Sequence, residues 1–456
     1  MERRETRTQY RSHSIQDTHS GEQIGFFGMN SEKWIRYVRR AGEKDFVFTT
    51  TFNLLDKETL RDGFKLLDGS KAVGIDGISK RVFKENLEEN LEKLAKDLKT
   101  GKYRPEPRKE TFIPKANGKL RPIAIACFKD KVVEATLAKI MSFTYEPLFI
   151  RNSFGFRPNK SAHKAIEASY TILKDNKRPW VVEIDFESFF NTVPHKELLS
   201  VIKKRINDKR LLNLVKLFMK SKIVSLGKET RPKVGTPQGS VVSPILSNIY
   251  LNEILDEWFA ENYASQDAQM VRYADDAIFM FAKKEEAEKF MITLSERMIK
   301  FKLRLNADKT KLIDFREEQK TVFSFLGFTF KWGKPTGKKR SGLKVHTQKD
   351  KLMKKSGEFK EWIKANRNGH KVSKLLKIAA SKLRGHYNYY GYKCNRTKLT
   401  HFYCLIEKHL YKWLNRRSQR KSYNWKQFRS LVDKRLPRPP EICFLKSLEV
   451  KNAKSW

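Results

Sequence analysis

Hydrophobic residues recur along the chain at two spacings, and the two spacings predict different elements. Intervals of three and four residues favour amphipathic helices, whereas short apolar stretches bounded by turn residues favour strands. The predicted helices are 60–67, 86–98, 129–144, 162–173, 196–206, 243–257, 284–300, 371–390 and 399–414. The predicted strands are 110–114, 181–185, 277–282 and 322–330, and strands become rare beyond Leu343. Because strands and helices interleave without a regular βαβ order, the fold class is predicted to be α+β.

Positive charge dominates the composition. The 456 residues include 95 Lys and Arg against 52 Asp and Glu, a net charge of +43. The charge is uneven, because residues 331–456 hold 35 Lys and Arg against 7 Asp and Glu, or +28. Solubility needs far less charge, and a compact chain tolerates such self-repulsion mainly when a polyanion neutralises it. The composition therefore predicts a nucleic acid partner, with a membrane surface as the weaker alternative.

The ends and the middle of the chain carry further compositional signals. The stretch 331–342 is rich in Gly, Pro and Lys, which predicts a linker between a mixed domain and a basic one. No apolar run approaches the roughly 18 residues of a membrane-spanning helix. The Arg-, Ser- and Thr-rich start resembles a transit peptide, but Glu2 and Glu5 oppose that interpretation. We expect a cytoplasmic protein without a membrane anchor, in which residues 1–30 are disordered or loosely attached.

The cysteines give no metal signal. Cys127, Cys394, Cys404 and Cys443 are scattered, without a C-x-x-C pair. The spacing of the Cys and His residues between Cys394 and His409 fits no common zinc finger. Reduced thiols are therefore expected.

Acidic residues stand out within two apolar segments of this basic chain. Asp275 and Asp276 interrupt the apolar run 271–280, where a tight hairpin turn would project both carboxylates towards one place. Glu183 and Asp185 lie two apart on a predicted strand and hence share a face. An ordinary polar turn and a solvated strand face are the alternatives. Converging carboxylates suit Mg²⁺, and two such ions can clamp the attacking and leaving oxygens of a phosphoryl displacement.

Seven segments in chain order resemble the conserved blocks of group II intron-encoded reverse transcriptases, and so many in order do not plausibly arise by chance. The likeness extends over roughly residues 50–435. The segments are Gly74-Ile-Asp-Gly77, Phe112-Ile-Pro-Lys115 with Lys119-Leu-Arg-Pro122, Ser153-Phe-Gly-Phe-Arg-Pro158, Thr236-Pro-Gln-Gly-Ser240 with Asn248-Ile-Tyr-Leu251, Tyr273-Ala-Asp-Asp276, Phe325-Leu-Gly-Phe328, and Leu383-Arg-Gly-His-Tyr-Asn-Tyr-Tyr-Gly391.

The resemblance implies a right-hand polymerase with fingers, palm and an α-helical thumb. The implied order is a polar segment 1–40, an N-terminal fingers extension 41–100, and fingers and palm 101–335. A maturase domain, which is the thumb, would occupy 345–435, and a short basic tail 436–456 would follow. Nothing resembling a Cys/His-rich nuclease domain follows Trp425. We therefore expect no endonuclease, and priming from a pre-existing 3′ end.

The resemblance also implies roles for residues around the substrate. Asp185, Asp275 and Asp276 would bind two Mg²⁺ ions, for which Mn²⁺ could substitute. Lys115 and Arg121 would bind the triphosphate, and solvated turn charges are the alternative for both.

Phe190 would exclude a ribose 2′-OH, with Phe189 in its place if the register slips by one, although either could belong to the core. Gln238 would contact the nucleotide or the template. Lys309 is a possible proton donor to pyrophosphate, or else a solvated charge. The expected nucleic-acid-binding residues are Arg157, Arg384, Arg416, Arg417 and Arg420. Aromatic residues of the basic region either stack on bases or hold a helical bundle together.

The predicted function is RNA-directed DNA synthesis from deoxynucleoside triphosphates on an RNA template with a DNA primer. In the intron setting, the protein would also bind group II intron RNA, assist its splicing and copy it into target DNA. Two alternatives remain: an RNA-binding splicing cofactor, and a domesticated reverse transcriptase in phage defence, CRISPR adaptation or DNA repair. A bacterial cytoplasmic location with the nucleoid or a ribonucleoprotein is predicted, and an organelle is the alternative.

Overall fold

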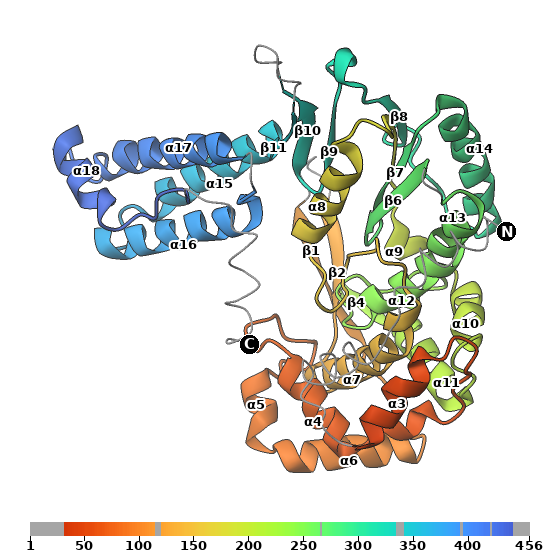
Figure 1. Ribbon diagram of the computed structural model, residues 1–456. Coiled ribbons are helices and arrows are strands. Elements are labelled where there is room, and N and C mark those ends of the chain that lie inside the picture. Colours follow the sequence, from red (N-terminus) through yellow and green to blue (C-terminus); the bar gives the residue numbers. More distant parts are fainter. Residues whose placement is uncertain are drawn as a thin grey trace. The chain divides into compact units, whose positions relative to one another are not determined.

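The computed structural model describes residues 32–114, 120–264, 267–333, 342–392, 395–419 and 422–440. It confirms a mixed fold of helices and sheets (Figure 1). The chain divides into two compact units. Unit 1 comprises the residues up to Ala165 together with Val181–Leu312, and unit 2 comprises Ile166–Trp180 and the residues from Ile313 onward.

The N-terminal part of unit 1 is a helical layer around one buried helix. Helix α7 (Phe128–Tyr145) is buried along nearly its whole circumference, as an element surrounded by others must be. Asp56 caps α4 by accepting a hydrogen bond from the Thr59 N–H at 2.9 Å. The surrounding helices are α3 (Glu32–Gly42), α4 (Lys57–Leu66), α5 (Lys80–Glu85) and α6 (Leu87–Lys99).

A four-stranded sheet in unit 1 has the order β2-β1-β4-β5. It consists of β1 (Arg108–Pro114), β2 (Leu120–Ile125), β4 (Ile223–Ser225) and β5 (Lys228–Thr230). Strands β1 and β2 are antiparallel, and β1 and β4 are parallel. Buried Arg108 forms an ion pair with buried Glu134 of α7, and its Nε donates to Ser221 Oγ at 2.7 Å. These contacts tie the sheet to α7.

A second four-stranded sheet has the order β6-β7-β3-β8. It consists of β3 (Trp180–Ile184), β6 (Ala268–Tyr273), β7 (Asp276–Phe281) and β8 (Lys311–Asp314), and β8 crosses the division between the units. Helix α14 (Lys284–Lys300) packs on it, with the rings of Phe290 and Phe279 4.6 Å apart. The other helices are α9 (Phe189–Thr192), α10 (His195–Lys203), α11 (Lys209–Met219), α12 (Ser243–Leu251) and α13 (Glu257–Asn262).

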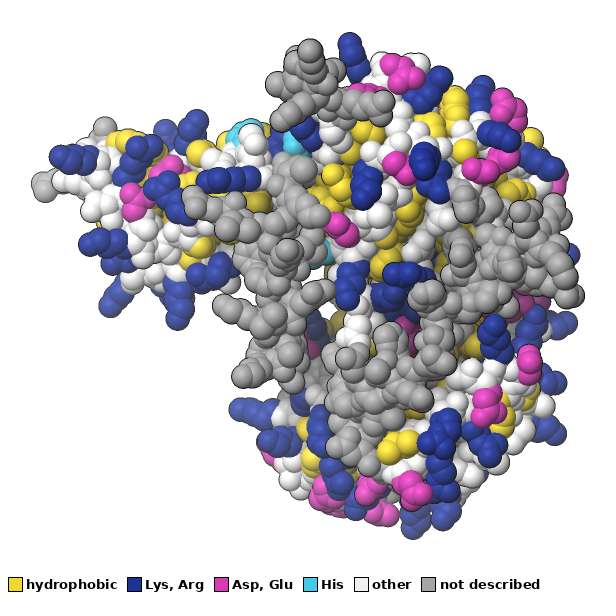
Figure 2. Space-filling view, viewed as in Figure 1, with side chains coloured by type: hydrophobic (Ala, Val, Ile, Leu, Met, Phe, Trp, Pro, Cys, Tyr) yellow, Lys and Arg dark blue, Asp and Glu magenta, His cyan; other side chains and the backbone are white. Residues whose placement is uncertain are grey.

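Unit 2 contains a three-stranded sheet of order β11-β10-β9 followed by helices. The strands are β9 (Val322–Phe325), β10 (Phe328–Trp332) and β11 (Leu343–Thr347), and the helices are α15 (Lys349–Asn366), α16 (Val372–Tyr390), α17 (Arg396–Leu414) and α18 (Trp425–Asp433), with α8 (Ala162–Leu173) crossing between the units. Many Lys and Arg side chains, among hydrophobic and a few acidic ones, lie on the visible face of α15–α18 (Figure 2). Within the described residues, no helix is both long and apolar enough to cross a membrane.

Two predicted elements were wrong in detail. The single strand predicted at 322–330 is a hairpin, because Leu326 and Gly327 take left-handed conformations with φ of 50° and 78° and reverse the chain. The helix predicted at 243–257 is interrupted by a π-helical turn, η3 (Asn252–Asp256), which the apolar spacing does not reveal. Most of the predicted linker, and residues 1–31 of the polar N-terminal segment, lie outside the described residues.

Candidate active site

Asp275 and Asp276 lie at a tight hairpin between β6 and β7, as predicted. Tyr273 pairs with Asp276 across the two strands, so only Ala274 and Asp275 form the turn. Ala274 adopts a left-handed conformation with φ of 57°. A residue with a Cβ atom costs about 1–2 kcal/mol in this conformation. Contacts elsewhere must therefore hold the turn.

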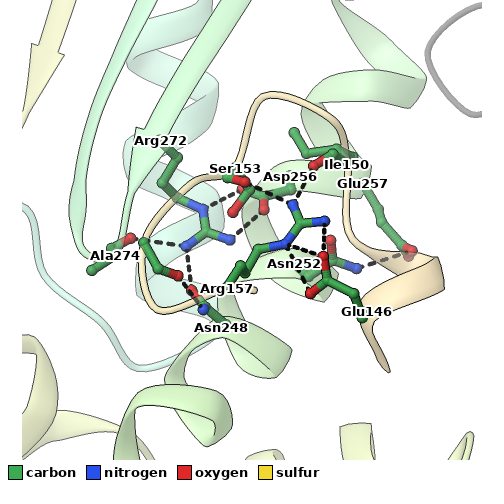
Figure 3. Close-up of polar contacts among 11 residues, drawn as sticks. Glu146, Ile150, Ser153, Arg157, Asn248, Asn252, Asp256, Glu257, Arg272 and Ala274 are labelled. Atoms are coloured by element: carbon green, nitrogen blue, oxygen red, sulfur yellow. Dashed lines mark hydrogen bonds and ion pairs between the residues drawn. The ribbon is translucent and has the colours of Figure 1, made fainter. Parts of the chain in front are cut away.

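Arg272 supplies the principal contact (Figure 3). Its fully buried guanidinium forms a two-pronged ion pair with Asp256 of η3, in which Nε donates to Oδ1 at 2.7 Å. Nη1 donates to the Ala274 carbonyl at 2.9 Å and to Asn248 Oδ1 of α12 at 3.0 Å. The strained turn is thus fixed from inside the protein by a charged group that itself has partners on two other elements.

The loop that contains residues 153–158 closes the same hairpin. The Phe154 N–H donates to the Arg272 carbonyl at 2.8 Å, and Asn248 Nδ2 donates to the Gly155 carbonyl at 2.7 Å. A Cβ atom at Gly155 would clash with the backbone nitrogen of Ala274. Three sequence-distant motifs therefore meet at the base of the acidic turn, and only glycine fits at their closest approach.

Asp185 follows β3 directly, and its side chain meets a lysine from a distant loop. Lys309 Nζ lies 2.9 Å from Asp185 Oδ2. The Asn306 N–H donates to the Asp185 carbonyl at 2.8 Å, which anchors that loop beside the strand. The structure thus brings Lys309 to the acidic group, while its role in proton transfer stays a prediction.

The three aspartates influence one another. Burial raises the pKa of Asp275, and the charge of Asp185 adds to the increase. The pKa of Asp276 is raised to about 7, first because neighbouring groups displace water and then because Asp275 and Asp185 carry like charge. Strands β7 and β3 are neighbours in the sheet, which agrees with this mutual influence of the carboxylates. The hairpin and the end of β3 therefore form one acidic site.

Arg121 on β2 belongs to the same neighbourhood. The charge of Arg121 lowers the pKa of Asp275 and so acts against the effect of burial on that pKa. The Arg121 side chain itself is exposed. An exposed guanidinium near two acidic residues can bind the phosphates of a ligand that the acids hold through cations. Lys115, its predicted companion, lies outside the described residues.

The donor set suits a hard cation. Carboxylate oxygens are the ligands that Mg²⁺ and Mn²⁺ prefer, and positive charge would relieve the mutual repulsion of the aspartates. Across the part of the chain that the structure describes, no three acidic, His or Cys side chains are arranged to hold a metal ion as they stand. Lys309 contacts Asp185 through Oδ2 alone, so a metal ion at this site would share the Asp185 carboxylate with the ammonium group or displace it.

Phe190 lies at the start of α9 next to the loop that carries Gln238. Its carbonyl accepts a hydrogen bond from the Thr236 N–H at 2.6 Å. The Phe190 side chain is half-buried, whereas Phe189 is only 2% exposed and packs on Phe186. Of the two candidates for sugar recognition, only Phe190 therefore has a partly accessible ring.

The Gln238 loop is held in place from two directions. The Gln238 carbonyl accepts the Ala124 N–H of β2 at 2.7 Å. Gly239 has φ of 98°, and a Cβ atom there would lie 2.7 Å from Ile123 Cγ2. Buried His195 contacts the Gly235 carbonyl through Nε2 at 2.6 Å. The sequence did not single out His195. Its only signal is that a polar residue stands at the start of a helix, and that signal does not show that the residue is buried.

The nucleic-acid role predicted for Arg157 does not fit the structure. Its side chain is 5% exposed and forms an ion pair with Glu146 at 2.8 Å. Its Nη1 also donates to the Ile150 and Ser153 carbonyls at 2.6 and 2.7 Å. Because these groups use the guanidinium inside the protein (Figure 3), Arg157 stabilises the loop behind the hairpin instead.

The other predicted RNA-facing arginines lie in unit 2. Arg384 on α16 and Arg416 just after α17 are exposed, and Arg417 is half-exposed. Exposure is what their predicted role requires, and that role stays a prediction. Arg420 lies outside the described residues.

The aromatic residues of the motif 383–391 and its flank mainly form the core of unit 2. Tyr387, Tyr390 and Tyr392 are buried. Tyr389 is 40% exposed, and its hydroxyl donates to the Leu326 carbonyl at 3.0 Å. A Cβ atom at Gly327 would lie 3.0 Å from the Tyr390 hydroxyl. The motif therefore fixes the turn between β9 and β10.

Comparison with known proteins adds to this geometry. Residues 113–330 match the family described as reverse transcriptase (RNA-dependent DNA polymerase). Protein YkfC of Escherichia coli (strain K12) is 33% identical over 294 residues, covering 57% of this chain and 76% of YkfC. Group II intron-encoded protein LtrA of Lactococcus lactis subsp. cremoris is 33% identical over 213 residues, which cover 46% of this chain and 35% of LtrA. The putative COX1/OXI3 intron 2 protein of Saccharomyces cerevisiae is 31% identical over 199 residues, which cover 43% of this chain and 22% of the yeast protein.

The matched region, which contains all three aspartates of the acidic site, is the domain of a reverse transcriptase, an RNA-directed DNA polymerase. Within that class, the chain belongs to the group II intron-encoded reverse transcriptase and maturase family. The family predicted from the ordered motifs is thereby confirmed. The match to LtrA and to the yeast intron protein spans about a third of their lengths or less.

Proposed function

We propose that this protein extends a DNA primer on an RNA template, using deoxynucleoside triphosphates. The observation that carries this proposal is the acidic site of Asp185, Asp275 and Asp276, within a chain of net charge +43. In this proposal, unit 1 provides the fingers and palm, β9 and β10 form the primer grip, and α15–α18 form the thumb.

The reaction joins the primer 3′ oxygen to the α-phosphorus of the nucleotide and breaks the bond to pyrophosphate. Asp185, Asp275 and Asp276 would hold two Mg²⁺ ions, which stabilise the charge on the transferring group when bound. Arg121 binds the triphosphate. Lys309 is held within reach of the site and can give a proton to the pyrophosphate as it leaves.

Selection of the nucleotide is assigned to Phe190 and Gln238. The half-buried ring of Phe190 excludes a ribose 2′-OH, and Gln238 contacts the nucleotide or its template base. The hydrogen bond between Phe190 and Thr236 supports this assignment, because it joins the segment of the ring to the Gln238 loop.

The names of the relatives support a role with a group II intron. In that role the protein binds the intron RNA, assists its splicing and copies it into target DNA in a bacterial ribonucleoprotein. Alternative settings are phage defence, CRISPR adaptation and DNA repair, which would use the same acidic site. Intron splicing at low Mg²⁺ with purified protein separates these settings, because only the intron-associated role requires acceleration.

The polymerase proposal is tested directly with the full chain, an RNA template, a DNA primer and the four deoxynucleotides. We expect extension with Mg²⁺ or Mn²⁺, its loss on chelation, and its recovery when the metal is restored. Absence of extension with both metals, for protein that binds the primer–template, would contradict the proposal.

Replacing Phe190 with valine should increase the use of ribonucleotides by about tenfold or more. The valine leaves room for the extra hydroxyl, and a pocket discriminates against one added group by about 1–3 kcal/mol. The measurement is the ratio of kcat/KM for a deoxynucleotide and its ribonucleotide. Phe189→Val is the matched control, since that ring is buried in the core and its loss should reduce stability. Unchanged discrimination in Phe190→Val with altered discrimination in the control would shift the assignment by one residue.

Replacing Tyr389 with phenylalanine should weaken the contact between α16 and the primer-grip turn. The lost hydrogen bond to Leu326 is worth about 1 kcal/mol, so KM for the primer–template should rise about fivefold and processivity should fall. Deoxynucleotide KM should change little. Tyr411→Phe makes the same chemical change elsewhere in the bundle and should leave both values unaltered.

A further inference from the structure

Four cations surround the indole of Trp413 in unit 2. Two come from the C-terminal end of α15 and two from that of α17. Their charged groups lie 5.0–5.9 Å from the ring centroid. The four residues, which we call the Trp413 cluster, are Lys364, Arg367, Lys412 and Arg416.

The backbone holds this cluster together. Arg367 Nε donates to the Arg416 carbonyl at 3.2 Å, and its Nη1 donates to the Lys364 carbonyl at 2.6 Å. Both carbonyls belong to helix ends, where the partial negative charge of the helix stabilises cations. Trp413 itself is only 8% exposed, so the ring is a fixed platform, whereas three of the cations are exposed and Arg367 is half-exposed.

The cluster lacks neutralising acids. Among the described residues, none of its four members forms an ion pair within 4 Å of a carboxylate. Other cations of unit 2 do, such as Lys355 with Glu358 on α15, and Arg438 with Asp433 at the end of α18. Like charges this close repel one another, and the indole face offsets only part of the cost. An anion from outside the chain would relieve the rest.

The ring of Trp413 also carries a hydrogen-bond donor without an acceptor. The buried indole Nε1 of Trp413 has no hydrogen-bond acceptor within the described structure. A buried donor without an acceptor is destabilising.

We propose that the Trp413 cluster is a binding site for the phosphodiester backbone of structured RNA. The proposal rests on the RNA-binding role proposed above and gives it a defined place on α15 and α17. A membrane surface fits less well, because interfacial binding needs apolar side chains beside the cations. The large hydrophobic side chains exposed in the described part of unit 2 are Val322, Met353 and Tyr389. Val322 and Tyr389 lie in other segments, and Met353 lies about three turns before Lys364 on α15. Figure 2 shows these helices to be rich in Lys and Arg.

The test compares two double variants of the full chain with equal loss of charge. Arg367→Gln with Arg416→Gln removes half of the cluster. Lys351→Gln with Lys374→Gln removes two exposed cations elsewhere in the bundle, one on α15 and one on α16. Affinity for an RNA hairpin is measured at several salt concentrations. The cluster variant should lose about tenfold in affinity and about 1–2 units of the slope of log K against log salt, as phosphate contacts disappear.

The control variant should lose less than about threefold, which is the effect of general charge. Equal losses in both variants would overturn the proposal, since the cluster would then be ordinary surface charge. A DNA hairpin of the same sequence distinguishes the polymers, and a loss confined to DNA would overturn the assignment to RNA.

Trp413→Phe provides a test at constant charge. A smaller ring holds cations less strongly, so RNA affinity should fall although no charge is removed. Melting temperature reports whether the bundle remains folded, and the arginine variants decide the question if it does not.

Primer extension by the wild-type chain is measured separately. Its absence would contradict the proposed polymerase activity, whereas a selective effect of the cluster on RNA binding would still stand.

Discussion

Replacing Asp275 and Asp276 with asparagine should abolish DNA synthesis while leaving RNA binding nearly intact. Asparagine preserves the shape of both side chains but removes the charges that would hold the metal ions. The loss of a metal clamp removes several kcal/mol of transition-state stabilisation. Since each 1.4 kcal/mol corresponds to a factor of ten, the rate of extension should fall by about 10³-fold or more.

The binding half of this prediction follows from where the positive charge lies. The +28 of residues 331–456 is unaffected by changes at the hairpin. Removing two carboxylates from a basic protein could even strengthen RNA binding slightly. Glu89→Gln, an exposed acid on α6, is the control for a change in charge. Primer extension and hairpin affinity are measured on the same protein, and near-normal extension would refute the assignment of the active site.

The sequence predicted the central elements because their signals are local. Strand β3 and strand β7 are short apolar runs, and Asp275 interrupts such a run where a buried strand cannot contain a charge. Helices α8 and α14 have the predicted ends, since their apolar spacing is uninterrupted. The grouping of Asp185 with the hairpin required the family resemblance, because these residues are far apart in the chain.

The supports of the site could not be predicted from local pattern. An arginine such as Arg272 or Arg157 resembles a surface cation in any sequence, and in a chain with +43 of charge it is easily assigned to RNA. Only the fold shows that Arg272 forms a buried ion pair with Asp256 and that Arg157 forms an ion pair with Glu146. The π-helical turn that presents Asp256 likewise gives no sequence signal, because it inserts no glycine or proline.

Removing Arg272 should cause the largest loss of stability. Arg272→Met leaves Asp256 buried without its partner, and breaking a buried pair in this way costs about 3–5 kcal/mol. It also leaves the Ala274 carbonyl and Asn248 without their donor. We therefore expect both a lower free energy of unfolding and a displaced acidic turn.

The loss should depend on pH. Burial raises the pKa of Asp256, while Arg272 lowers it. Without Arg272 the folded-state pKa rises further above that of the unfolded chain, so the folded state binds more protons. Stability of the variant then falls relative to wild type as pH rises above the unfolded pKa of about 4. The difference in unfolding free energy between variant and wild type should accordingly be larger at pH 8 than at pH 5.

A matched variant separates stability from catalysis. Arg205→Met removes another buried arginine, one that donates to the Ala41 and Phe46 carbonyls and lies in a part of unit 1 distinct from the hairpin contacts. Both variants should unfold in less urea than wild type. Per folded molecule, Arg205→Met should retain extension activity and Arg272→Met should lose most of it, because only the latter releases the Ala274–Asp275 turn. Equal activity per folded molecule would show that Arg272 serves stability alone.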